Sequence, residues 1–73
     1  MNRKMVRELK DEENGVAAQM WEFDDHFNIM IYDIEAEEYY PFITRISKSL
    51  PAEVLENAWA RTVSDEFTFT VQL

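Results

Sequence analysis

The stretch VAAQMWEFDDHFNIMIYDI, residues 16–34, decides the fold of this chain. Two runs rich in β-branched and aromatic residues, 16–23 and 27–34, flank the polar triplet DDH at residues 24–26. Runs of this composition are typical of strands, and aspartates between them are typical of a tight turn. The stretch therefore predicts a β-hairpin over residues 16–34.

The apolar residues of this hairpin also predict its register. A three-residue loop would place Trp21 opposite Ile29 and would give one apolar face and one mixed face. A sheet with one buried side requires that division. A two-residue loop would instead place Glu22 opposite Phe27 and mix the two faces. We therefore expect the three-residue loop.

The remainder of the chain supplies the other elements. PAEVLENAWART, residues 51–62, predicts a helix, because Pro51 suits a first helical turn and apolar residues recur along one stripe. FTFTVQL ends the chain with strict alternation of apolar and polar residues, so a half-buried strand is expected over residues 66–73. Residues 39–47 fit either a strand or a short helix, and their alternation slightly favours the strand. Residues 1–13 fit a helix or a strand equally well, and residues 1–4 are expected to fray.

This order of elements predicts an α+β fold in one small domain, residues 1–73. We expect a small antiparallel sheet, made of the hairpin 16–34 and the C-terminal strand 66–73 and covered on one face by the helix 51–62. The chain has no cysteine, so disulfides and thiolate metal sites are excluded. A chain of 73 residues must then be held together by packing alone, or must share its core with a second chain.

The N-terminus lacks the apolar segment of a signal peptide, and no apolar run is long enough to span a membrane. A cytoplasmic protein that does not bind membranes is therefore expected.

Charge is the most informative feature for function. The formal net charge is −8, and residues 11–44 contain ten acidic residues but no lysine or arginine. Direct binding to nucleic acid requires basic residues that contact phosphates, so this segment argues against it. Solvation is one explanation of such a segment. The alternative that we favour is attraction to a basic partner, because interspersed lysines would have removed the self-repulsion.

The candidate chemical sites have simpler explanations. His26 beside two aspartates is typical of a polar hairpin loop, and three consecutive residues rarely converge on one ion. The carboxylates of residues 33–38 lack the glycine that a calcium-binding loop needs for its turn. The chain contains no GxSxG, P-loop or HExxH motif. We therefore expect no catalytic residues, no metal and no cofactor, and a protein that is not an enzyme.

These inferences lead to a hypothesis of function. The chain is expected to be a small acidic binding protein, an inhibitor or regulator, whose carboxylates dock on a basic surface of a partner protein, with a nucleic-acid-binding surface as one candidate. Tyrosines beside the acids would supply buried contacts. The expected partner-binding residues are Glu22, Asp24, Asp25, Tyr32, Asp33, Glu35, Glu37, Glu38, Tyr39 and Tyr40.

In size and acidity the chain is similar to small phage or mobile-element proteins that inhibit host nucleases or polymerases. That similarity transfers no residues. The alternative is a self-associating structural or accessory subunit without nucleic-acid mimicry, a homodimer paired through the edge of the strand 66–73.

Overall fold

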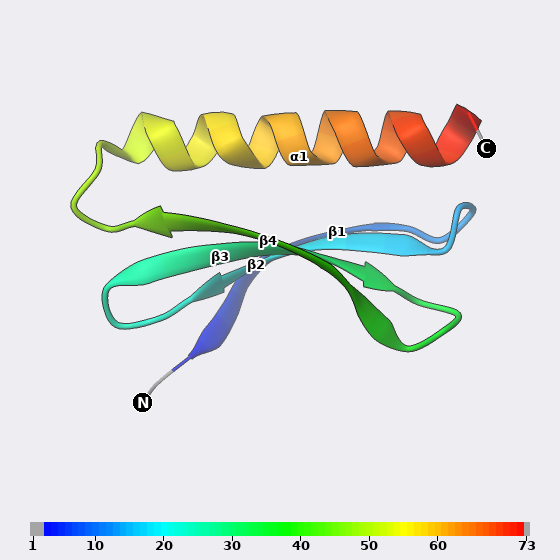
Figure 1. Ribbon diagram of the computed structural model, residues 1–73, viewed down its shortest axis with the longest axis horizontal. Coiled ribbons are helices and arrows are strands. Elements are labelled where there is room, and N and C mark those ends of the chain that lie inside the picture. Colours follow the sequence, from blue (N-terminus) through cyan, green and yellow to red (C-terminus); the bar gives the residue numbers. More distant parts are fainter. Residues whose placement is uncertain (1–2, 73) are drawn as a thin grey trace.

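The structure is a computed structural model that describes the backbone of residues 3–72 and the side chains of residues 3–64. It is an α+β fold in which four antiparallel strands follow one another across the sheet in chain order, before a single helix (Figure 1). The elements are β1 (Lys4–Asp11), β2 (Val16–Glu22), β3 (His26–Asp33), β4 (Glu38–Ser47) and α1 (Ala52–Gln72). The expected fold class is therefore confirmed, and each connection in the sheet is a short turn.

The core lies between one face of the sheet and α1, which runs along that face (Figure 1). Val16, Ala18 and Ile31 form a buried cluster. Trp59 and Val63 of the helix pack against this cluster. Burying these side chains stabilises the helix on the sheet, since apolar area removed from water is worth about 25 cal/mol per Å². A helix lies along one face of the sheet, as expected, but it packs on that face only weakly.

A bidentate ion pair also joins the helix to the sheet. The guanidinium of Arg7, on β1, donates to both carboxylate oxygens of Glu56 at 2.9 and 2.8 Å. The same guanidinium lies 5.4 Å from the centre of the Trp59 ring. The helix is thus tied to an edge strand as well as to the core.

The predicted hairpin is present, but its predicted register is wrong by one residue. Glu22 pairs with Phe27 and Met20 with Ile29, so Asp24 and Asp25 form a two-residue loop. The backbone N–H of Phe23 closes this loop by donating to the carbonyl of His26 at 2.8 Å. The shift turns β2 over relative to β3, because alternate residues of a strand point to opposite sides: Ile29 and Ile31 stay on the buried face, and the even-numbered residues of β2 replace the odd-numbered ones beside them.

The buried side of the hairpin therefore differs from the expected one. Val16, Ala18 and Met20 face the helix, and Trp21 lies on the other side of the sheet. The two-residue loop was rejected because it places Glu22 among apolar residues. In the structure Glu22 lies at the end of the strand, where lysines neutralise it.

The predicted C-terminal strand is also wrong. Residues 66–72 continue α1, and Leu73 lies outside the described residues. The predicted helix 51–62 is correspondingly too short. No glycine or proline follows residue 51, so nothing ends the helix, and extending a helix adds a hydrogen bond for each residue fixed. The spacing of Leu55, Trp59 and Val63 in steps of four continues to residues 67 and 71, and this was the signal for a longer helix.

The two segments whose sequences fitted either a helix or a strand both form strands. Residues 4–11 form β1 and residues 38–47 form β4, so the lean toward a strand over 39–47 is confirmed. Pro41 lies where the register between β3 and β4 shifts. An edge strand with such an irregularity tolerates proline, which has no N–H to donate to a neighbouring strand.

Two turns meet at the end of the sheet away from the hairpin loop. Gly15 has a φ of 73° in the β1–β2 turn, and Glu37 has a φ of 57° in the β3–β4 turn. The N–H of Ile34 donates to the carbonyl of Gly15 at 2.9 Å, which joins the two turns. This contact brings together acidic residues that are more than twenty positions apart in the chain.

The described part of α1 does not have the apolar length that a membrane-spanning helix needs.

Candidate partner-binding surface

The acidic residues of segment 11–44 separate to two ends of the sheet. The β2–β3 loop lies at one end, and the β1–β2 and β3–β4 turns lie at the other (Figure 1). The eight-residue strand β3 connects the ends. It spans about 23 Å at about 3.3 Å per residue. The structure therefore does not bring the expected binding carboxylates into one continuous patch.

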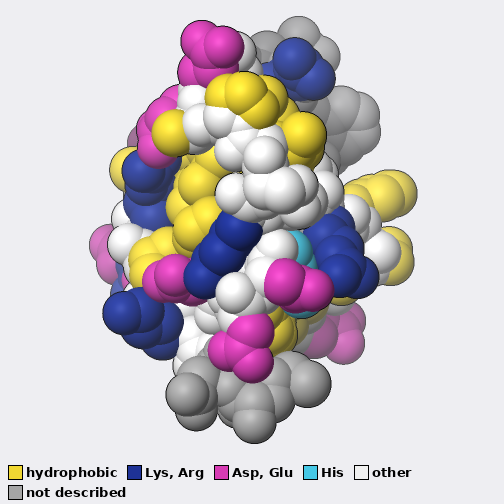
Figure 2. Space-filling view, turned by 90° about the vertical axis from the view of Figure 1, so that its left-hand side faces the viewer, with side chains coloured by type: hydrophobic (Ala, Val, Ile, Leu, Met, Phe, Trp, Pro, Cys, Tyr) yellow, Lys and Arg dark blue, Asp and Glu magenta, His cyan; other side chains and the backbone are white. Residues whose placement is uncertain are grey.

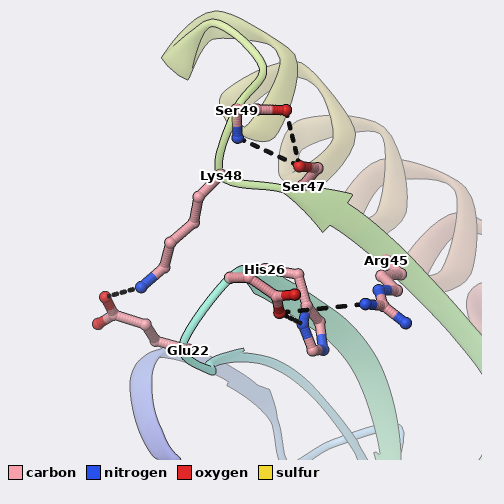
Figure 3. Close-up of polar contacts among 7 residues, drawn as sticks. Glu22, His26, Arg45, Ser47, Lys48 and Ser49 are labelled. Carbon is pink, nitrogen blue, oxygen red and sulfur yellow. Dashed lines mark hydrogen bonds and ion pairs between the residues drawn. The ribbon is translucent and has the colours of Figure 1, made fainter.

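We define the hairpin end as Glu22, Asp24 and Asp25 together with Lys4, Arg45 and Lys48. Its three negative charges are matched by three positive charges. Lys48 donates to Glu22 at 2.8 Å (Figure 3). Lys4 lies 4.0 Å from the same carboxylate. The hydrogen bond from Lys48 holds the pKa of Glu22 below its ordinary value. These lysines come from β1 and from the segment after β4, so the local sequence around Glu22 gave no sign of them.

Asp25 also has basic side chains close to its carboxylate. Its carboxylate lies 2.6 Å from Nδ1 of His26 and 4.0 Å from Arg45 (Figure 3). The hydrogen bond with His26 is the main cause of the lowered pKa of Asp25, and the charge of Arg45 adds to it. The imidazole also stacks on Phe23, with ring centres 4.7 Å apart. Figure 2, which views this end, shows basic side chains interspersed among the acidic ones.

The other end carries most of the uncompensated negative charge. We define the acidic end as the seven carboxylates of the two joined turns, Asp11, Glu12, Glu13, Asp33, Glu35, Glu37 and Glu38. Among the side chains that the structure describes, none of the seven has a lysine, arginine or histidine within 4.0 Å. All except Asp11 and Asp33 are exposed. The C-terminal end of α1, the negative pole of its dipole, lies at the same end of the molecule (Figure 1).

Two of these carboxylates hold the turns in shape. Asp11 accepts hydrogen bonds from the backbone N–H and the side-chain amide of Asn14, at 3.3 and 2.8 Å. Asp33 accepts from the N–H of Ala36 at 3.1 Å. The remaining five carboxylates are thus presented on ordered turns. Within the described residues, no three acidic or histidine side chains converge as a metal site requires.

The face of the sheet opposite α1 adds aromatic groups beside the acidic end. Tyr32 and Tyr39 pair across β3 and β4 with ring centres 4.9 Å apart, one residue from the pair formed by Asp33 and Glu38. Tyr40, the third expected contact residue, instead packs against the core on the helix side. Two of the three tyrosines therefore lie on the open face.

A buried glutamine organises this open face. Gln19 is 7% exposed, and its Oε1 accepts from Trp21 Nε1 and from the Tyr39 hydroxyl, both at 2.9 Å. Its Nε2 donates to Glu8 at 2.9 Å. The Trp21 and Tyr39 rings border a hollow of about 300 Å³. Sequence reasoning missed this role of Gln19, although a lone amide within the apolar run VAAQMW was a usable signal.

Comparison with protein-family models gives no match for this chain, and comparisons with curated proteins and with solved structures give none either.

Proposed function

We propose that this chain is a small non-enzymatic binding protein, an inhibitor or regulator, that docks its acidic end on a basic surface of a partner protein. A nucleic-acid-binding surface is the kind of partner that fits best, because it is built to bind closely spaced negative charges. The observation that carries this proposal is the segregation of charge. At the hairpin end Glu22 and Asp25 have basic partners, whereas among the described side chains no lysine, arginine or histidine lies within 4.0 Å of a carboxylate of the acidic end.

Electrostatics supply the physical reason. Seven carboxylates on two adjoining turns repel one another, and a basic surface would relieve that repulsion when it binds. Exposed charges of this kind mainly raise the rate of association, and they do so less at high salt. Tyr32 and Tyr39, beside the acids, would lose contact with water in the complex and so slow dissociation.

The test is capture of a partner from a lysate by the immobilised protein, followed by measurement of its binding kinetics. We expect recovery of a basic protein at low salt, with association slowed by about tenfold or more at about 0.5 M NaCl because the attraction is screened. The triple variant Glu35→Gln, Glu37→Gln, Glu38→Gln should bind that partner more slowly by a similar factor.

The hairpin end provides a matched control. The variant Glu22→Gln, Asp24→Asn, Asp25→Asn also removes three negative charges, but from the opposite end of the sheet. It should retain most of the association rate. Two results would overturn the proposal: capture of no basic protein at low salt, or equal losses in the two triple variants.

A further inference from the structure

The two edges of the sheet differ sharply in how well they are protected from pairing with another strand. β1 carries five charged residues among its eight and has a β-bulge between Met5 and Arg7. Charges and bulges are the usual means by which proteins block an exposed edge. The second half of β4, FITRIS at residues 42–47, has a single charge, Arg45, and no proline.

The β4 edge also carries the most exposed large apolar side chains among the described residues of the sheet. Phe42 is 68% exposed and Ile43 is 56% exposed. They point to opposite sides of the sheet because they are consecutive in a strand. Leu50, just beyond β4, is 48% exposed. A strand added at this edge would cover apolar surface on both faces, and it would satisfy the outward-facing backbone groups of residues 42–47.

We propose that residues 42–46 of β4 pair antiparallel with the same segment of a second copy of this chain, across a two-fold axis. The pairing joins the two sheets into one of eight strands. A two-fold axis through Thr44 places Phe42 opposite Ile46 of the partner subunit and keeps both helices on the same side of the sheet. Pro41 and the register shift beside it end the paired segment.

The charge distribution favours a second copy as the occupant of this edge. Antiparallel pairing directs the acidic end of each copy toward the end of its neighbour that carries Arg45 and Lys48. It also keeps the two acidic ends at opposite extremes of the joined sheet, where their repulsion is smallest. Parallel pairing would place the two acidic ends side by side.

The contact is independent of the proposed function, because it leaves the turns of the acidic end exposed. A pairing of five residues from each copy lies at the small end of protein interfaces, so we expect dissociation constants in the micromolar range. Strand hydrogen bonds and apolar contacts supply most of its stability. Self-association should therefore persist at salt concentrations that abolish capture of a basic partner.

Sedimentation velocity of the whole chain tests this proposal. At about 10–500 µM, which brackets the affinity of a small interface, the wild-type protein should shift from monomer to dimer in 0.15 M and in 0.5 M NaCl. Ile43→Lys and Phe42→Lys should each weaken dimerisation at least tenfold, since a lysine on either face loses apolar contact and adds repulsion across the axis. Far-UV circular dichroism establishes that the variants are folded.

Leu9→Lys is the matched control, because Leu9 is 44% exposed on the opposite edge strand and the substitution adds the same charge. It should dimerise like the wild type. A wild-type monomer at 500 µM would overturn the proposal, and so would equal weakening by Leu9→Lys. The proposal would also be overturned if Ile43→Lys weakened dimerisation and Phe42→Lys did not. That result would assign the contact to the open face of the sheet rather than to the strand edge.

Discussion

Gln19 shows how a single buried amide can order an exposed surface. Its carbonyl oxygen accepts two hydrogen bonds, from Trp21 and Tyr39, which come from different strands. Gln19→Leu leaves both donors without that partner. We expect the free energy of unfolding, measured by urea denaturation, to fall by about 1–3 kcal/mol. This is the usual cost of leaving a buried donor without a hydrogen-bond acceptor.

Tyr39→Phe is the comparison for this substitution. It removes one donor and leaves the bond between Gln19 and Trp21 in place, so the loss should be smaller, about 0.5–1.5 kcal/mol. If Gln19→Leu were as stable as the wild type, the amide would have no structural role on this face.

Gly15 is required by backbone conformation rather than by space. Its φ is +73°, and a Cβ placed there would lie 3.7 Å from Cγ of Glu35, an ordinary contact. Gly15→Ala should therefore cost only the strain of the left-handed conformation, about 1–2 kcal/mol in thermal or urea unfolding. Gly15→Asn should cost less, because asparagine tolerates this conformation. Equal stability of the alanine variant would contradict the assigned turn.

Among the elements, α1 is attached to the sheet through few side chains. It is one of two layers, and Trp59 is a main contact between them. Trp59→Ala should destabilise the protein by about 2–3 kcal/mol, at the low end for tryptophan because the ring is only partly buried. Arg61→Ala, on the exposed side of the same helix, should change stability by less than about 0.5 kcal/mol. Similar losses in both variants would argue against packing of the helix through Trp59.

Element prediction failed where two patterns fitted the same residues. The alternation over 66–73 matched a strand, whereas spacing in steps of four from Leu55 onward matched a helix. The missing stop signal after residue 62 distinguished the two patterns, because a new strand needs a turn before it. The hairpin register failed for a related reason: Glu22 was judged by its neighbours in sequence, and its lysine partners come from other elements.

At the scale of the whole molecule, pH should act through three paired carboxylates. Hydrogen bonds from Lys48 and Arg7 lower the pKa of Glu22 and Glu56 from their ordinary value of 4.5, and His26 lowers that of Asp25 from 3.8. A lowered pKa in the folded state stabilises the protein above the ordinary value, and this contribution is lost as the pH falls through the folded pKa.

We therefore expect the melting temperature to fall with decreasing pH below about 4.5, in the range where these carboxylates take up protons. The fall should be shallower in the double variant Glu22→Gln, Glu56→Gln, which lacks two of the three pairs. Thermal unfolding followed by circular dichroism from neutral to acidic pH provides the measurement. The same slope in the variant and the wild type would show that these pairs do not contribute to stability.

Composition and local pattern were sufficient to establish a small α+β domain, a central hairpin and a helix after Pro51, because these follow from periodicity and turn chemistry along the chain. Only the tertiary structure decided which carboxylates remain without partners. Strand pairing brings Lys4, Lys48 and Arg45 to the hairpin end and gathers residues 11–13 and 33–38 at the other. Charge neutralisation depends on distances of a few ångströms between distant segments, and no local pattern in the chain encodes those distances.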